Sequence, residues 1–83
     1  MKELLLYGRP GCHLCEDMGA ALEEFRSEYG FRLREIDVDG DPGLAARFGA
    51  LIPVLALDGR EICHYHLDPV ALRRALVGAG ETG

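Results

Sequence analysis

Hydrophobic residues in this 83-residue chain follow two patterns, short apolar runs and stripes at helical spacing. The apolar runs predict four strands, over residues 2–7, 31–38, 52–57 and 60–66. Apolar residues that recur every three or four positions predict three helices, over residues 12–29, 42–49 and 69–78. The predicted order of elements is therefore βαβαββα. In the second strand the apolar residues change parity between Leu33 and Ile36, which indicates either a β-bulge or an exposed start to the strand.

Turn and cap residues between these segments indicate how the strands are arranged. Asp58-Gly59 is typical of a two-residue type I′ hairpin, so the third and fourth strands should be antiparallel. The first strand–helix–strand unit requires parallel strands joined by a right-handed crossover. We therefore expect an α/β fold with a four-stranded mixed sheet flanked by helices. Residues 1–78 are expected to form a single domain, and residues 79–83 a flexible tail.

Length, charge and cysteine count narrow the classes of function. The net charge of −5 argues against binding to nucleic acid or to an anionic membrane surface. No apolar run approaches the length of a signal-peptide core or a membrane span. Three cysteines form an odd set that does not suit a disulfide-stapled secreted domain, so we expect a reducing, cytoplasmic location. We also expect a monomer.

Two of the cysteines, Cys12 and Cys15, lie three positions apart where the first strand gives way to the first helix. A Cys-x-x-Cys pair beside a βαβ pattern is typical of a thioredoxin-like redox site. Cys12 falls at the predicted helix N-terminus, where free backbone N–H groups and the helix dipole favour a thiolate. Cys15 lies one helical turn further on, close enough to form a disulfide with Cys12.

The stretches Tyr7–Cys15, Glu35–Asp39 and Ile52–Val54 together resemble the glutaredoxin branch of the thioredoxin superfamily, and the resemblance extends over residues 2–78. It implies a thioredoxin-like fold. It also implies that Cys12 is the nucleophile and Cys15 the resolving cysteine of thiol–disulfide exchange.

The same resemblance assigns roles to residues outside the cysteine pair. Pro53 would be a cis-proline that faces the cysteines, and the peptide group of Ile52 would pair with the substrate backbone. Arg9 and His13 are candidate cationic groups at the substrate-binding surface beside Cys12. His13 stands where many glutaredoxins have a proline.

The implied substrates are a disulfide-containing protein or a glutathione mixed disulfide, with a reductase or glutathione as the electron donor. We expect no bound cofactor. The glycine pair that anchors glutathione in glutaredoxins is replaced here by the segment His64–Asp68. The resemblance therefore supports dithiol exchange more directly than it supports glutathione binding.

Two other functions use the same residues differently. Cys12 and Cys15 could hold zinc or an iron–sulfur cluster in a binding module, or the chain could be a redox-inactive interaction domain of thioredoxin fold. Cys63 is expected to be a small buried side chain, with Glu61 and Tyr65 on the same face of its strand. A metal site that joins Cys63, His64 and His66 to the first two cysteines would require four converging ligands. We expect no such metal site.

Overall fold

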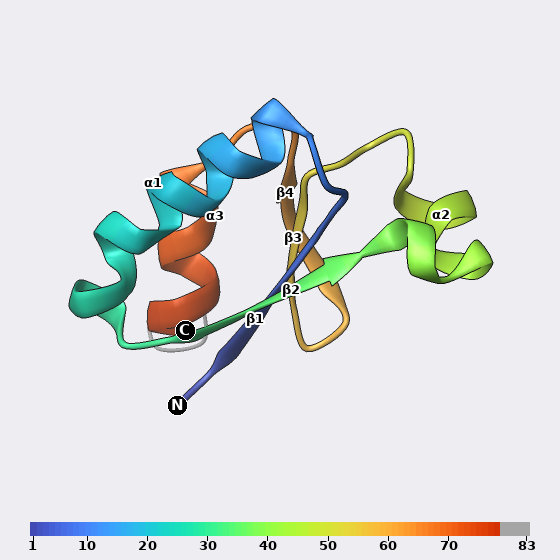
Figure 1. Ribbon diagram of the computed structural model, residues 1–83. Coiled ribbons are helices and arrows are strands. Elements are labelled where there is room, and N and C mark those ends of the chain that lie inside the picture. Colours follow the sequence, from blue (N-terminus) through green and yellow to red (C-terminus); the bar gives the residue numbers. More distant parts are fainter. Residues whose placement is uncertain (79–83) are drawn as a thin grey trace.

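The computed structural model describes residues 1–78, and the predicted order of elements is confirmed (Figure 1). The tail expected at residues 79–83 lies outside the described residues. The strands are β1 (Glu3–Gly8), β2 (Arg32–Asp37), β3 (Val54–Leu57) and β4 (Arg60–His64). The helices are α1 (His13–Tyr29), the 3₁₀ helix η1 (Val38–Gly40), α2 (Pro42–Phe48), α3 (Pro69–Arg73) and the π-helical turn η2 (Arg74–Gly78). The 3₁₀ helix η1 was not expected from the sequence.

The four strands form one mixed sheet in the order β2-β1-β3-β4. β1 and β2 are parallel, whereas β3 runs antiparallel to both β1 and β4. The turn between β3 and β4 has the expected type I′ character, with positive φ at Asp58 (51°) and Gly59 (80°). The mixed sheet predicted from the sequence is therefore confirmed.

Helices cover both faces of the sheet. Figure 1 shows α1 and α3 together on one side and α2 on the other. The core on the α1 and α3 side is built from Leu4, Leu6, Met18, Leu22, Phe31, Leu55, Cys63 and Leu72. The smaller core on the α2 side contains Val38, Phe48 and Val54, and the Tyr7 ring stacks on Phe48 at 4.5 Å between centroids. Alternating residues of β1 and β3 thus contribute to opposite cores, as the strand geometry requires.

Of the two alternatives for the second strand, the β-bulge is excluded and the exposed start is found, since Arg32, the first residue of β2, is exposed. β2 pairs with β1 one residue to one, from Glu3↔Arg32 to Gly8↔Asp37. Leu33 packs against the core on the α1 side, and strand alternation places Ile36 on the opposite face, the side of Val38. Leu33 and Ile36 therefore face opposite sides of a largely exposed edge strand, and the apolar residues change parity with no irregularity in the pairing.

An irregularity does occur between β3 and β4. Leu55 pairs with Cys63 but Ala56 pairs with Glu61, so Ile62 is an extra residue in β4. Cys63 and Glu61 therefore lie on opposite faces, and the expectation that they share a face is wrong. β4 also ends at His64 rather than His66, and β3 begins after Pro53, which has no N–H to donate to a ladder.

The two short helices begin at the expected caps. The Asp41 carboxylate accepts hydrogen bonds from the N–H groups of Gly43 and Leu44, at 2.8 and 3.3 Å. Asp68 likewise accepts from Val70 and Ala71, both at 3.1 Å. Within residues 1–78, we find no helix with both the length and the apolar character needed to span a bilayer.

Candidate functional site

The Cys-x-x-Cys pair lies at the edge of the sheet where β1 ends and the chain turns into α1. A tight turn makes this connection: Gly11 has φ +78°, and the Cys12 N–H donates to the Arg9 carbonyl oxygen at 3.3 Å. A φ value in this range favours glycine, because a Cβ would crowd the backbone there. The turn fixes the direction in which Cys12 enters the helix.

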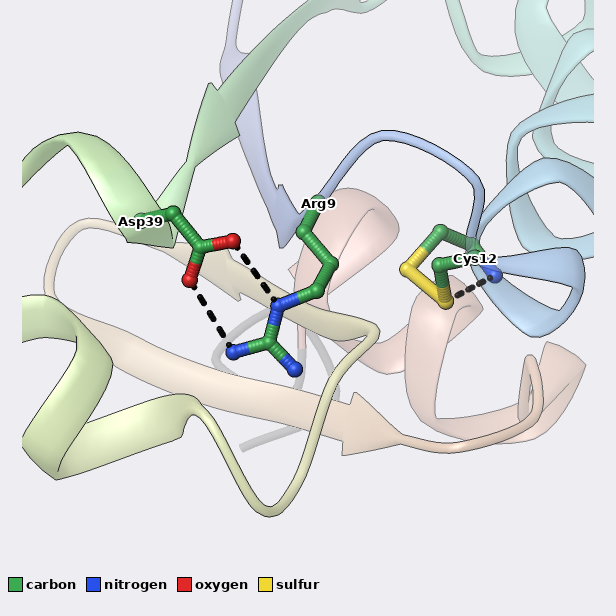
Figure 2. The surroundings of a disulfide bond; sticks show 4 residues. Arg9, Cys12 and Asp39 are labelled. Atoms are coloured by element: carbon green, nitrogen blue, oxygen red, sulfur yellow. Dashed lines mark hydrogen bonds and ion pairs between the residues drawn. A yellow bond between two sulfur atoms is a disulfide. The ribbon is translucent and has the colours of Figure 1, made fainter.

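Cys12 is the N-cap residue of α1. Its backbone is extended (φ −89°, ψ 111°), and its Sγ atom accepts a hydrogen bond from the Cys15 N–H at 3.1 Å (Figure 2). The sulfur thus occupies the place that a serine or aspartate oxygen takes at an ordinary N-cap. In the dithiol form, this N–H donor and the helix dipole would favour negative charge on Cys12, whose side chain is partly exposed. The sequence-based placement of Cys12 at the helix start is confirmed.

Cys15 forms a disulfide with Cys12, and their Cα atoms are 5.2 Å apart, within the usual range for such bonds. Cys15 packs closely against Gly8, the last residue of β1. A Cβ atom added at Gly8 would lie 2.8 Å from the Cys15 Sγ and 3.2 Å from its Cβ. Gly8 therefore makes room for the second sulfur, a role that the sequence analysis missed. A glycine at the end of the strand, just before the cysteine turn, was the available signal.

The two candidate cationic groups have different surroundings. The Arg9 guanidinium makes two contacts with the Asp39 carboxylate, Nε to Oδ2 and Nη2 to Oδ1, each 3.2 Å (Figure 2). This ion pair fastens the cysteine turn to η1. His13 is the first residue of α1 and is exposed. Within residues 1–78, no side-chain hydrogen bond or ion pair joins Arg9 or His13 to either cysteine.

Pro53 and Ile52 precede β3 at the same edge of the sheet as the cysteine turn. Tyr7 pairs with Val54, so the chain before Val54 and the chain after Gly8 leave the sheet side by side. The Ile52–Pro53 bond is cis, as the resemblance implied, and Pro53 is fully buried. Among residues 1–78, none forms a hydrogen bond with the backbone N–H or the carbonyl oxygen of Ile52. Ile52 thus keeps a free peptide donor and acceptor near the cysteine pair.

A cleft of about 340 Å³ opens on the Cys15 side of the site. Its walls come from the cysteine turn, the first turn of α1 and the carboxyl end of β2. They include the carboxylates of Glu16, Glu35 and Asp37. The sequence analysis did not connect β2 with the site. The signal was the parallel pairing, because parallel β1 and β2 end at the same edge of the sheet.

Cys63 is remote from this chemistry. It is buried in the core on the α1 and α3 side, as expected for a small apolar side chain. Burial raises the pKa of its thiol, and the nearby carboxylates of Asp68 and Glu61 raise it further, while a hydrogen bond with the Asp68 backbone opposes the shift. No three histidine, cysteine or acidic side chains in the described part of the chain are grouped so that they could hold a metal ion.

Comparison with known proteins shows which family this chain resembles. Residues 3–77 match the family model described as Glutaredoxin-like domain (DUF836). Uncharacterized proteins of Mycobacterium bovis and Mycobacterium tuberculosis are each 44% identical over 73 residues, which is 82% of this chain and 75% of theirs.

Solved structures extend the likeness to the whole fold. The solution structure of a Nitrosomonas europaea protein is 38% identical and superposes with a TM-score of 0.85 over 90% of this chain and 91% of that one. Oxidized mitochondrial thioredoxin 3 from Saccharomyces cerevisiae is 25% identical, with a TM-score of 0.62 over 92% of this chain and 76% of that one.

Proposed function

This chain belongs to the glutaredoxin-like domain family and has a thioredoxin-like fold with a Cys-x-x-Cys pair, and on that premise we propose that it is a small dithiol thiol–disulfide oxidoreductase. Its substrates would be protein disulfides or glutathione mixed disulfides. The observation that carries the proposal is the position of the Cys12 sulfur at the N-cap of α1, with the Cys15 N–H as its donor at 3.1 Å. That environment favours the thiolate, the form of cysteine that attacks disulfides.

The reaction proceeds through two exchanges. Cys12 thiolate attacks one sulfur of the substrate disulfide, a Cys12–substrate disulfide forms, and the other substrate sulfur leaves as a thiolate that takes a proton from water. The Cys15 thiol then loses its proton, and its thiolate attacks the Cys12 sulfur. The Cys12–Cys15 disulfide forms and the second substrate sulfur leaves. Two electrons have moved from the protein dithiol to the substrate.

The geometry of the pair suits the second exchange. The two residues lie one helical turn apart on α1, with a Cα–Cα distance of 5.2 Å, so the disulfide closes without movement of the backbone. Gly8 leaves space for Cys15 against the end of β1. The resolving sulfur is therefore held close to Cys12 while the mixed disulfide exists, which gives the intramolecular attack a high effective concentration.

Substrate binding would use the free peptide group of Ile52 together with Pro53. An extended substrate segment could add its own N–H and C=O groups to that peptide, as peptides do at exposed strand edges. Arg9 and His13, in the turn and at the start of α1, would face the flanking part of the substrate. Arg9 would act with its charge partly balanced by Asp39.

Regeneration of the dithiol needs two electrons, which we assign to glutathione or to a reductase. The proposal includes no bound cofactor and a monomeric protein in the cytoplasm. A cytoplasmic location provides the reducing surroundings in which such a pair cycles.

The test is disulfide reduction by wild type, Cys12→Ser and Cys15→Ser. Wild type should reduce a disulfide-linked peptide with glutathione or thioredoxin reductase as donor, and Cys12→Ser should be inactive. Cys15→Ser should accumulate a mixed disulfide that mass spectrometry detects at Cys12. Cys63→Ser is the matched control, because its sulfur is buried away from the site. Equal activity in wild type and Cys12→Ser would refute the proposal, as would stoichiometric zinc or iron in anaerobically purified protein that is lost in Cys12→Ser.

A further inference from the structure

Tyr65, the residue directly after β4, has an unusual backbone conformation. Its φ is +65°. Among residues 1–78, only Tyr65 and one other non-glycine residue have a positive φ. The other, Asp58, is in the hairpin turn, where aspartate is common. A tyrosine in this region is disfavoured by crowding of its Cβ, and such residues persist where surrounding contacts hold them.

Two hydrogen bonds hold Tyr65 in place, and both go to the segment before β3. The Tyr65 backbone N–H donates to the Pro53 carbonyl oxygen at 2.9 Å. The Tyr65 hydroxyl donates to the Ala50 carbonyl oxygen at 3.0 Å. Its ring also packs edge-on against the His64 ring, with centroids 4.7 Å apart. One residue therefore contacts both ends of the segment 50–53.

The middle of that segment contains Ile52, whose peptide groups have no partner among residues 1–78. The segment has one further tie, the Leu51 N–H to the Phe48 carbonyl oxygen at 2.8 Å. In Figure 1 the segment is the yellow stretch between α2 and β3, which reaches the sheet beside the end of β4. Without the tyrosine hydroxyl, the only hydrogen bond from residues 1–78 in its first half would be that of Leu51, although the side chains of Leu51 and Ile52 also pack against the core on the α2 side.

We propose that Tyr65 is a positioning residue that presents the Ile52 peptide to an extended polypeptide substrate. The inference rests on the proposed function and adds to it a residue outside the cysteine turn on which binding of the peptide part of the substrate depends. Ordering a flexible loop during binding costs conformational entropy and so weakens affinity. The hydrogen bond from the Tyr65 hydroxyl to Ala50, which we call the brace, orders the loop already in the free protein and removes that cost. The positive φ of Tyr65 belongs to a tight turn that the His66 N–H closes on the His64 carbonyl oxygen at 2.7 Å, and the Tyr65 hydroxyl reaches back to Ala50.

The consequence is a difference between two kinds of disulfide. A disulfide flanked by peptide uses both Cys12 and the Ile52 peptide group. Hydroxyethyl disulfide carries no amide and uses Cys12 alone. Loss of the brace should therefore weaken exchange with the first substrate relative to the second.

The experiment compares Tyr65→Phe with wild type on a disulfide-linked peptide dimer and on hydroxyethyl disulfide. The substitution removes only the hydroxyl, so the ring and the N–H bond to Pro53 remain. The ratio of kcat/KM for the peptide to that for hydroxyethyl disulfide should fall about fivefold, the effect of one lost neutral hydrogen bond. The fall should come from a higher KM for the peptide, with kcat retained.

Tyr29→Phe is the matched control, since Tyr29 is at the far end of the 17-residue helix α1. It loses the same hydroxyl, and its substrate ratio should equal that of wild type. A ratio in Tyr65→Phe equal to that of wild type, whether both rates hold or both fall together, would overturn the positioning role while leaving the proposed function standing. Wild type that reduces neither disulfide would overturn both.

Discussion

Substitution of Gly8 by alanine should make the Cys12–Cys15 disulfide a stronger oxidant. The added Cβ would lie 2.8 Å from the Cys15 Sγ, a distance that real Cβ atoms essentially never show, and 3.2 Å from the Cys15 Cβ, which is tighter than most such contacts. In the oxidised protein the Cys15 sulfur is bonded to Cys12 and cannot move away. In the reduced protein the Cys15 side chain can turn to another rotamer. The clash therefore acts mainly on the oxidised form.

The size of the effect follows from the cost of overpacking. An extra methyl group forced into a filled site typically costs about 1–3 kcal/mol. For a two-electron couple, about 30 mV corresponds to 1.4 kcal/mol. If the whole cost falls on the disulfide form, the reduction potential of Gly8→Ala should rise by roughly 20–65 mV. Relief of the clash in the reduced form determines where in that range the value falls.

The measurement is equilibration of wild type and variant in a series of glutathione redox buffers, followed by alkylation and mass spectrometry. Gly19→Ala serves as the control. Its added Cβ would meet only a Leu6 methyl group at 3.9 Å, an ordinary contact, so although Gly19 lies one turn of α1 beyond Cys15, the Cβ would contact neither sulfur. It should stabilise oxidised and reduced protein alike by up to about 1 kcal/mol and leave the potential unchanged.

Thermal unfolding of both redox forms completes the test. Gly8→Ala should lower the melting temperature of the oxidised protein more than that of the reduced protein. A potential for Gly8→Ala equal to that of wild type, or a more negative one, would show that Cys15 does not depend on space at Gly8. Equal destabilisation of the two redox forms would show that the clash does not act mainly on the oxidised form, and would refute the predicted shift in potential.

Two further predictions concern stability. Asp41→Ala should lower the free energy of unfolding by about 1 kcal/mol, because its carboxylate accepts two N–H groups in the first turn of α2 at 2.8 and 3.3 Å. A fall of about 4–8 °C in Tm would confirm it, and an unchanged Tm would contradict it. Burial and nearby carboxylates raise the pKa of Cys63, so the unfolded chain loses this proton first as the pH rises. The free energy of unfolding of the oxidised protein should therefore fall above about pH 8.5, the usual thiol pKa. Urea unfolding at pH 7 and 9.5 should show this loss in wild type and a smaller one in Cys63→Ala; equal losses would contradict it.

Much of the fold could be predicted because its signals are local. Asp41 and Asp68 cap their helices as expected, and Asp58-Gly59 forms the expected turn. Although the pairing of β1 with β3 was not predicted, the mixed character of the sheet also follows from such signals, since a crossover requires one parallel pair and a hairpin requires one antiparallel pair. These features depend on residues a few positions apart, and the sequence displays them directly.

Two other features that the sequence did not predict have a different cause, because each of them depends on what lies next to β2 in the folded protein. The parity change between Leu33 and Ile36 left a bulge and an exposed start open when β2 was considered alone. Its regular pairing with β1 excludes the bulge, and β2 is a largely exposed edge strand. Glu35 was likewise assigned to no site, although it lines the cleft beside Cys15. Neither fact can be obtained from β2 without knowing what packs on each of its faces.

The extra residue in β4 links core packing with the proposed substrate site. Counted from the hairpin without a bulge, Ile62 would face Leu55, Cys63 would pair with Val54 on the α2 face, and His64 would come opposite Pro53. With Ile62 as the extra residue, Cys63 enters the core on the α1 side, and the N–H that meets the Pro53 carbonyl oxygen belongs to Tyr65. The bulge thereby places Tyr65 opposite Pro53, next to Ile52. The tyrosine side chain is long enough for its hydroxyl to reach the Ala50 carbonyl oxygen. A one-residue change of register in an edge strand thus decides both which core Cys63 enters and which side chain holds the segment before β3.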